Sequence, residues 1–302
     1  LSRRQRQMCI RDRERGIKVI DEQLWEKENG RWQLVMKVMV KDGCVTTREL
    51  TKAVAGALNR RMIPEKDTKT LIGKGVNLYT YEEEPRFQAI YGVARMVKDG
   101  AAVSGDNFSF LEPESGKMVM CLSDGMGSGS LACKESEMVI ELVEKFLEAG
   151  FDVETAARMM NSAMVMKGQE DLFSTVDISE LDLYDGTCRF YKIGAAATFI
   201  RRNGIVECLI STSLPVGVSY KLDMEKSEKD LYNGDFLVMV SDGVLEYLHV
   251  PNPEETMQEI IESIETNNAT ILAKRILERV LLFTGGKAAD DMTVLATAIW
   301  EK

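Results

Sequence analysis

The sequence has few of the residues that build most transition-metal and histidine-dependent active sites. Among its 302 residues there is one histidine, His249, and the six cysteines form no Cys-x-x-Cys pair. A zinc site needs several imidazole or thiolate ligands, and a serine–histidine–aspartate site would depend on His249 alone. A catalytic metal in this chain would therefore have carboxylate ligands, which favour hard ions such as Mg²⁺ or Mn²⁺.

Long apolar stretches and a surplus of positive charge are absent as well. The longest wholly apolar stretches are as short as Phe236–Val240, whereas a membrane span needs roughly 18–20 residues. The chain has 38 Lys and Arg against 48 Asp and Glu, a net charge of −10, which argues against nucleic acid as the main partner. Several cysteines lie in apolar runs, so we expect reduced thiols in a cytoplasmic protein.

The first residues resemble something other than a natural protein sequence. Arg3–Arg13, with five arginines, match one reading frame of a transposase-based sequencing adapter. The alternative is a basic targeting or nucleic-acid-binding arm, which so many arginines would suit. We interpret residues 1–13 as non-native adapter translation, and we expect the natural protein to extend upstream of Glu14.

Residues 14–85 predict a small strand-and-helix module, which we interpret as the tail of an upstream regulatory module. Thr46 and Glu49 have the spacing of a capping box, which marks a helix start. Apolar residues at helical spacing continue to Met62, and Pro64 is expected to end the helix. Two strands are expected before it, at Gly16–Ile20 and Trp32–Val40.

Residues 86–302 alternate between short strands and amphipathic helices. The dipeptides Asp185-Gly186 and Asn203-Gly204 are strong hairpin turns, so much of the sheet should be antiparallel. Strands joined as hairpins, with helices in pairs, predict sheet packed on sheet with helices outside. The expected helices cover residues 131–147, 153–166, 253–265 and 269–283. The expected strands are Ile90–Val97, Met118–Leu122, Thr175–Leu183, Arg189–Ile193, Ala197–Arg201, Ile205–Ile210, Phe236–Val240 and Thr293–Trp300.

Acidic residues lie at the ends of several apolar segments. The tripeptide Ser-Asp-Gly occurs twice, each time after a predicted buried strand, and places Asp124 and Asp242 at strand ends. Asp106 follows another apolar region, and Asp290 and Asp291 directly precede the last strand. Strand ends on a rigid sheet can hold like charges close together. The set therefore predicts a carboxylate-bridged pair of hard metal ions.

Two other interpretations of these motifs are open. Most Asp-Gly pairs only cap turns, although all the acidic sites here also adjoin apolar segments. Gly127, Gly129 and Ala132 fit the G-x-G-x-x-A pattern of dinucleotide-binding loops. Against that, the sheet has hairpin turns rather than repeated βαβ units, and Asp124 lies where the cofactor phosphates would approach.

In order along the chain, these motifs resemble those of the metal-dependent (type 2C, PPM) serine/threonine phosphatases. The resemblance covers about residues 86–300 and implies an α+β fold, a four-layer α/β/β/α sandwich. Finer features resemble the bacterial stage II sporulation protein E group, including the segment that precedes its catalytic domain. The residues that carry both resemblances are Asp106, Asp124–Gly127, Ser241–Gly243 and Asp290–Thr293, with Val45–Thr47, Glu83–Arg86, Val103–Asp106 and Gly194–Ala197 for the bacterial group.

The resemblance implies a role for each motif residue. Asp124 would bridge two Mn²⁺ or Mg²⁺ ions, with the Gly125 carbonyl as a further ligand. Asp106 would bind or orient the first ion through water, while Asp242 and Asp290 would hold the second. The bridging water would attack phosphoserine in line.

Three positions qualify this assignment. Asp291 would replace Asp290 as the ligand if the register were shifted by one residue. Met126 stands where many eukaryotic members have a histidine, and no arginine matches the family's phosphate clamp, so protonation of the leaving group would depend on metal-bound water. His249, just before a proline, is expected to be incidental.

By resemblance, the function is that of a protein serine/threonine phosphatase acting on a phosphorylated STAS-type anti-sigma-factor antagonist, which activates a sporulation sigma factor. Membrane spans and a region that binds a cell-division protein would lie upstream, with this part in the cytoplasm. A homodimer is expected, and the helix over residues 128–147 is a candidate switch. The alternatives are a regulatory pseudophosphatase that binds phosphoproteins without hydrolysis and a stress-response phosphatase of the same catalytic type.

Overall fold

The computed structural model describes residues 17–27, 30–40, 45–65, 68–112, 116–127, 129–166, 173–283 and 285–302. The contacts divide the chain between Pro85 and Arg86 into two compact units. The residues interpreted as adapter translation, 1–13, lie outside the described ranges. No helix in the described ranges is both long and apolar enough to cross a membrane.

The first unit is a small antiparallel sheet with one helix packed on it. Its four-stranded sheet has the order β1-β2-β6-β4, and the short strands β3 and β5 form a separate pair. Buried Leu34, Leu50 and Tyr81 belong to the single core cluster between helix and sheet. The elements are β1 (Ile17–Glu26), β2 (Trp32–Val40), β3 (Val45–Thr46), α2 (Thr47–Leu58), β4 (Met62–Pro64), β5 (Leu71–Ile72) and β6 (Val76–Glu83).

The helix of the first unit starts as the sequence predicts but ends earlier. The backbone N–H of Thr46 donates to Glu49 Oε2 over 2.9 Å, and that of Glu49 donates to Thr46 Oγ1 over 3.3 Å, which completes the capping box. The prediction that the helix continues to Pro64 is wrong. Asn59 adopts a left-handed conformation with φ of 54°, which ends the helix, and Met62 begins β4.

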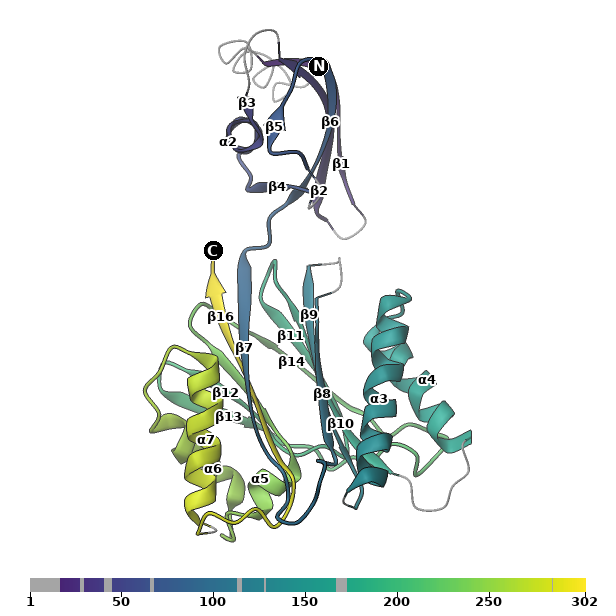
Figure 1. The fold of residues 1–302 in the computed structure, drawn as a ribbon, viewed down its shortest axis with the longest axis vertical. Helices are drawn as coiled ribbons and strands as arrows, with labels where there is room; N and C mark the ends of the chain where they lie inside the picture. Colours follow the sequence, from purple (N-terminus) through teal and green to yellow (C-terminus); the bar gives the residue numbers. More distant parts are fainter. Residues whose placement is uncertain are drawn as a thin grey trace. The chain divides into compact units, whose positions relative to one another are not determined.

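The second unit is a four-layer α/β/β/α sandwich, which confirms the predicted fold class (Figure 1). Two five-stranded antiparallel sheets have the orders β14-β11-β10-β9-β8 and β13-β12-β15-β16-β7. The strands are β7 (Phe87–Met96), β8 (Asp106–Leu111), β9 (Lys117–Gly125), β10 (Ser174–Asp182), β11 (Thr187–Ile193), β12 (Thr198–Arg202), β13 (Ile205–Leu209), β14 (Glu225–Asp230), β15 (Phe236–Val240) and β16 (Met292–Glu301). The helices are α3 (Ser130–Glu148), α4 (Val153–Met166), α5 (Asp242–Glu246), α6 (Pro253–Glu262) and α7 (Ala269–Phe283).

Three hydrophobic clusters hold the four layers together. Helices α3 and α4 pack through residues such as Val139 and Met160 on the first sheet. Helices α5, α6 and α7 cover the other sheet. Between the sheets lies a third cluster, which includes Met118, Phe190 and Leu237. Each sheet is therefore covered on both faces, which explains why β15, in the middle of the second sheet, is wholly apolar and buried.

In the second unit the predicted strands are confirmed, but two strands were missed; in the first unit β3, β4, β5 and β6 were not predicted. β14 has the sequence Glu-Lys-Ser-Glu-Lys-Asp and lies at the edge of its sheet, where charged side chains discourage pairing with other chains. Such a strand has no apolar alternation to reveal it. The other missed strand is β8. Asp106 begins it, so this acidic residue lies at the start of a strand as well as after the apolar region that the sequence shows.

Candidate metal centre

The acidic motifs come together where strands of the two sheets end. Asp106, the first residue of β8, lies directly opposite Asp124 of β9 in the antiparallel register. Opposite residues in such a ladder have Cβ atoms about 4.5–5.5 Å apart. Asp242 is the first residue of α5, immediately after β15 and Ser241. Asp290 and Asp291 immediately precede β16, the strand paired with β15.

The pKa values of Asp106 and Asp124 reflect burial first and neighbouring carboxyl groups second. Burial, followed by contact with the carboxyl groups of Asp242 and Asp106, raises the pKa of Asp124 to about 11. Burial also raises the pKa of Asp106 to about 6, and the negative charges of Asp291 and Asp242 act in the same direction. Like charges held together in a partly dry site favour the protonated form. The structure thus brings Asp106, Asp124 and Asp242 into one electrostatic cluster.

The chemistry of this cluster fits a hard divalent cation. Asp106 has no exposed surface, and neither of its carboxylate oxygens has a hydrogen-bond partner. Within the described ranges no group of three or more acidic, histidine or cysteine side chains is placed to hold a metal ion by itself. A buried carboxylate without a partner is costly, and oxygen ligands are those that Mg²⁺ and Mn²⁺ prefer. The oxygen donors present are therefore of the kind that such an ion binds, and they form part of a ligand set.

Asp290 and Asp291 differ clearly in their surroundings. Asp291 is 4% exposed. Its Oδ1 accepts the backbone N–H of Lys98 over 2.9 Å and its Oδ2 accepts that of Gly105 over 2.7 Å. The Asp290 side chain is 36% exposed, and its Oδ1 lies 3.6 Å from Lys98 Nζ. Asp291 is thus engaged in fixing the chain just before Asp106, whereas Asp290 is accessible from solvent.

Three polar side chains that the sequence analysis missed hold the segment around Asp106. Arg95 Nη2 donates to the Asp106 carbonyl over 2.7 Å. Ser136 Oγ, on α3, donates to the Gly105 carbonyl. Asn107 Nδ2 donates to Ser136 Oγ over 2.8 Å. Asn107 adjoins a motif residue, but nothing in the sequence marks Arg95 or Ser136, because they reach the site from other elements.

Two glycines in the Ser-Asp-Gly motifs allow close backbone contacts at the site. A Cβ at Gly125 would lie 2.2 Å from the carbonyl oxygen of Ala132 in α3. A Cβ at Gly243 would lie 2.2 Å from the carbonyl oxygen of Asp291. Contacts this short exclude any side chain, so each glycine lets a neighbouring element approach its acidic residue. The glycine after each aspartate therefore has a packing reason.

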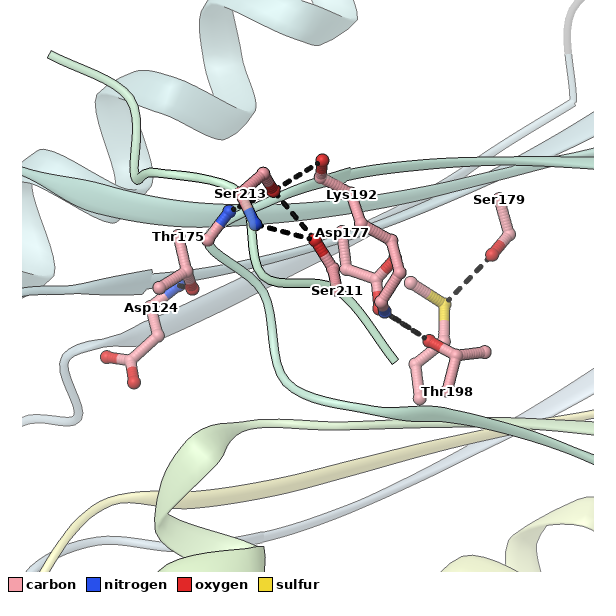
Figure 2. Close-up of polar contacts among 10 residues, drawn as sticks. Asp124, Thr175, Asp177, Ser179, Lys192, Thr198, Ser211 and Ser213 are labelled. Atoms are coloured by element: carbon pink, nitrogen blue, oxygen red, sulfur yellow. Dashed lines mark hydrogen bonds and ion pairs between the residues drawn. The ribbon is translucent and has the colours of Figure 1, made fainter. Parts of the chain in front are cut away.

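A buried polar network extends from the site into the space between the sheets (Figure 2). The side chains of Lys192 and Asp177 form an ion pair and are 4% and 2% exposed. Thr198 Oγ1 accepts from Lys192 Nζ over 2.8 Å and donates to Asp177 Oδ2 over 2.5 Å. Two residues before Asp177 on β10, Thr175 Oγ1 accepts the backbone N–H of Asp124 over 3.3 Å. The network therefore connects β10, β11 and β12 beneath the acidic cluster.

The same network fixes residues 194–197, which link β11 to β12. The Gly194 N–H donates to Ser213 Oγ over 3.0 Å, and Ser213 Oγ donates to the Lys192 carbonyl over 3.0 Å. The hydroxyl groups of Ser211 and Ser213 lie 2.7 Å apart. These bonds fix Gly194, the first residue of the link, and residues 195–197 of the link lie beside Asp242.

Neither Met126 nor His249 makes a hydrogen bond or ion pair with the acidic cluster. Met126 follows Gly125 and its side chain is 54% exposed. His249 is exposed after α5, with a left-handed φ of 49° and its ring centroid 5.5 Å from that of Tyr247. Nothing in this geometry gives the histidine a part in the site.

Known proteins resemble this chain over most of its length. The stage II sporulation protein E from Bacillus subtilis (strain 168) is 29% identical over 285 residues, which cover 94% of this chain and 34% of the relative. The protein of the same name from Priestia megaterium is 34% identical over 209 residues, 69% of this chain and 36% of the relative. The chain thus spans about a third of the length of these relatives.

The solved structures agree with this relationship. The PP2C phosphatase domain of B. subtilis SpoIIE, with a fragment of its regulatory domain, matches with a TM-score of 0.76 and 28% identity, covering 99% of this chain and 87% of that one. The family model for stage II sporulation protein E matches residues 114–299. With its two-sheet sandwich and its ordered acidic motifs, this chain belongs to the stage II sporulation protein E (SpoIIE) family of PP2C-type serine phosphatases.

Proposed function

We propose that this chain hydrolyses phosphoserine or phosphothreonine in a protein substrate with the help of divalent metal ions. The observation that carries the proposal is the cluster of buried Asp106, half-buried Asp124 and exposed Asp242 in a PP2C-type domain. A cation would supply the partner that the Asp106 oxygens lack, and it would offset the repulsion that raises the pKa values of Asp106 and Asp124.

In this proposal the acidic residues divide the binding of two Mn²⁺ or Mg²⁺ ions among them. Asp124 would bind both ions, with the Gly125 carbonyl as a further ligand, and Asp106 would bind or orient the first ion through water. Asp242 and the solvent-accessible Asp290 would hold the second. When bound, the ions supply Lewis-acid chemistry, because they activate water and neutralise the phosphate.

Of the neighbours Asp290 and Asp291, Asp291 is the less suitable metal ligand. Both of its oxygens already accept backbone N–H groups, and these bonds hold the segment that carries Asp106. We therefore assign Asp291 a positioning role and retain Asp290 as the ligand. The alternative register, with Asp291 on the metal, would require those two hydrogen bonds to be shared or broken.

The proposed substrate is a phosphorylated STAS-type anti-sigma-factor antagonist, and its dephosphorylation would activate a sporulation sigma factor. This follows from membership in the SpoIIE family and from the resemblance of residues 14–85 to the segment that precedes the catalytic domain. Residues 14–85 would be the tail of a regulatory module, and the phosphatase would act as a homodimer. Membrane anchoring and contact with a cell-division protein would belong to upstream regions, with this part in the cytoplasm.

The test is release of phosphate from a phosphorylated STAS protein, measured with Mn²⁺, with Mg²⁺ and after chelation. Asp242→Asn should lower kcat/KM by more than about a hundredfold, because even the outer partners of metal ligands contribute about 10–100-fold. Glu259→Gln, an exposed change on α6, is the matched control and should keep full activity.

Three results would change the assignment. Tight binding of the phosphoprotein without hydrolysis would support the pseudophosphatase alternative. Hydrolysis of a STAS protein from a stress pathway in preference to the sporulation antagonist would support the alternative of a stress-response phosphatase. Full activity after complete metal removal would contradict the metal-dependent proposal itself.

A further inference from the structure

A pocket of about 230 Å³ opens beside Asp242. Its walls are the residues 195–197 that link β11 to β12, Ile210 and Ser211 after β13, helix α5, and the first residues of α6. Pockets that hold whole small molecules are larger, about 300–1,000 Å³. A pocket of this size next to a proposed metal ligand is suited to a single side chain of a larger substrate.

The lining of this pocket combines an apolar surface with two negative charges. Ala196, Leu245 and the 61%-exposed Ile210 supply the apolar part. Glu246 and Glu254 supply the carboxylates, and neither has a basic partner among the residues that the structure describes. A positive charge would therefore be favoured at this place.

Two parts of the pocket wall have restricted backbones: the link that begins at Gly194 and the first turn of α6. Gly194, at the start of the link, is bonded to Ser213, which is bonded in turn to the Lys192 carbonyl. Pro253, at the first turn of α6, has a restricted backbone as well. Preformed walls lose little conformational entropy on binding, which favours selection of a particular side chain.

We propose that this pocket receives a lysine or arginine side chain of the phosphoprotein substrate, from a position close in sequence to the phosphorylated residue. The proposal rests on the proposed phosphatase function. The methylene groups lie against Ala196 and Ile210, as long basic side chains do on apolar surfaces, and the charge lies near Glu246 and Glu254. The basic residue thus guides the phosphate toward Asp242.

The experiment uses the full chain with Mn²⁺ and phosphoserine peptides rich in alanine, in which one lysine is moved through each position flanking the phosphoserine. The readout is the ratio of kcat/KM for each lysine peptide to that for the all-alanine peptide. We expect one flanking position to give a ratio of about tenfold, the size of a partly desolvated charged contact. Norleucine at that position, which keeps the methylenes and loses the charge, should give a clearly smaller ratio.

The variants test which residues make this selection. Glu254→Gln should lower the lysine-to-alanine ratio several-fold, and Glu254→Lys should reverse the preference in favour of a glutamate peptide. Glu259→Gln lies on the same helix, outside the pocket, and should leave the ratio unchanged. The charge-reversal result is the stronger one, because a general loss of folding lowers both rates and cannot invert a preference.

Hydrolysis of p-nitrophenyl phosphate, which has no flanking residues, separates the two proposals. If this ester and every peptide remain intact with Mn²⁺, the phosphatase function fails, and the pocket assignment fails with it. If the ester and peptides are hydrolysed but lysine, norleucine and alanine give equal rates at every position, only the pocket assignment is overturned. If the norleucine and lysine peptides are hydrolysed at equal rates, and both faster than the alanine peptide, the proposed basic occupant is overturned as well, because the pocket then selects an aliphatic side chain.

Discussion

The buried ion pair between Lys192 and Asp177 allows a sharp prediction about stability. The two side chains are 4% and 2% exposed between the sheets, and Asp177 Oδ1 has no hydrogen-bond partner. Lys192→Met keeps the length of the side chain and removes its charge. Asp177 would then retain only the hydroxyl of Thr198. We expect this single change to lower the free energy of unfolding by about 3–5 kcal/mol.

The magnitude follows from removing one partner while the other charge stays buried. For a domain of about 150–250 residues, each kcal/mol shifts Tm by roughly 2–4 °C, so the expected fall is between about 6 and 20 °C. The double change Lys192→Met with Asp177→Leu removes both charges. It should recover most of the loss, because apolar replacements of a buried pair are often neutral or stabilising.

The assay is chemical and thermal unfolding of the chain followed by circular dichroism. The matched control is Lys226→Met, which breaks the ion pair with Glu154 on the surface, where the side chains are 43% and 35% exposed. Exposed pairs contribute about 0–1 kcal/mol, so this control should cost little. If Lys192→Met cost no more than the control, or if the double variant were no more stable than the single one, the reasoning about burial would be refuted.

Three further predictions concern the metal centre. Gly125→Ala would place a Cβ 2.2 Å from the α3 backbone. Calorimetry should therefore show a Mn²⁺ affinity at least about tenfold weaker than that of the unchanged chain. Gly73→Ala, with nothing within 4 Å of the added atom, is the control and should leave the Mn²⁺ affinity unchanged. Because the pKa of Asp106 is raised to about 6 and that of Asp124 to about 11, the metal-free protein should lose stability as pH rises above about 4. Asp106→Asn should make this loss less steep between about pH 4 and 6, with the contribution of Asp124 remaining; equal slopes in both proteins would contradict the assignment. Asp290→Asn should weaken Mn²⁺ binding with little change in Tm. Asp291→Asn should instead lower the unfolding free energy by about 1.5–3 kcal/mol, because it loses hydrogen bonds to the backbone. The reverse outcome would make Asp291 the ligand.

Much of the fold could be predicted because its signals are local. The capping box at Thr46 and Glu49 and the cap formed by Asp152, whose Oδ1 accepts the Thr155 N–H over 2.9 Å, depend on residues three positions apart. The hairpin turns at Asp185-Gly186 and Asn203-Gly204 are equally local. The repeated Ser-Asp-Gly after apolar strands identified acidic strand ends, and the cluster of Asp106, Asp124 and Asp242 indeed forms there.

The parts that escaped prediction depend on contacts between distant elements. Lys192 lies in an apolar strand, where nothing local indicates that it would be paired with Asp177 on β10 rather than exposed. Ser136 reaches Gly105 from α3, and a serine inside a helix gives no signal of such a bond. The pocket beside Asp242 is made by four separate segments. Each of these features is set by register and packing, which a single sequence does not display.

Helix α3 contacts two segments of the proposed metal centre. The backbone of Gly125 lies against Ala132, and Ser136, one turn further along the helix, holds the Gly105 carbonyl beside Asp106. A displacement of α3 would therefore change both the Gly125 carbonyl and the Asp106 segment. An effector that favours one position of α3 would therefore change the affinity for metal. Because binding linkage is reciprocal, the metal would change the affinity for that effector by the same factor. This coupling is the physical basis for treating α3 as the proposed switch.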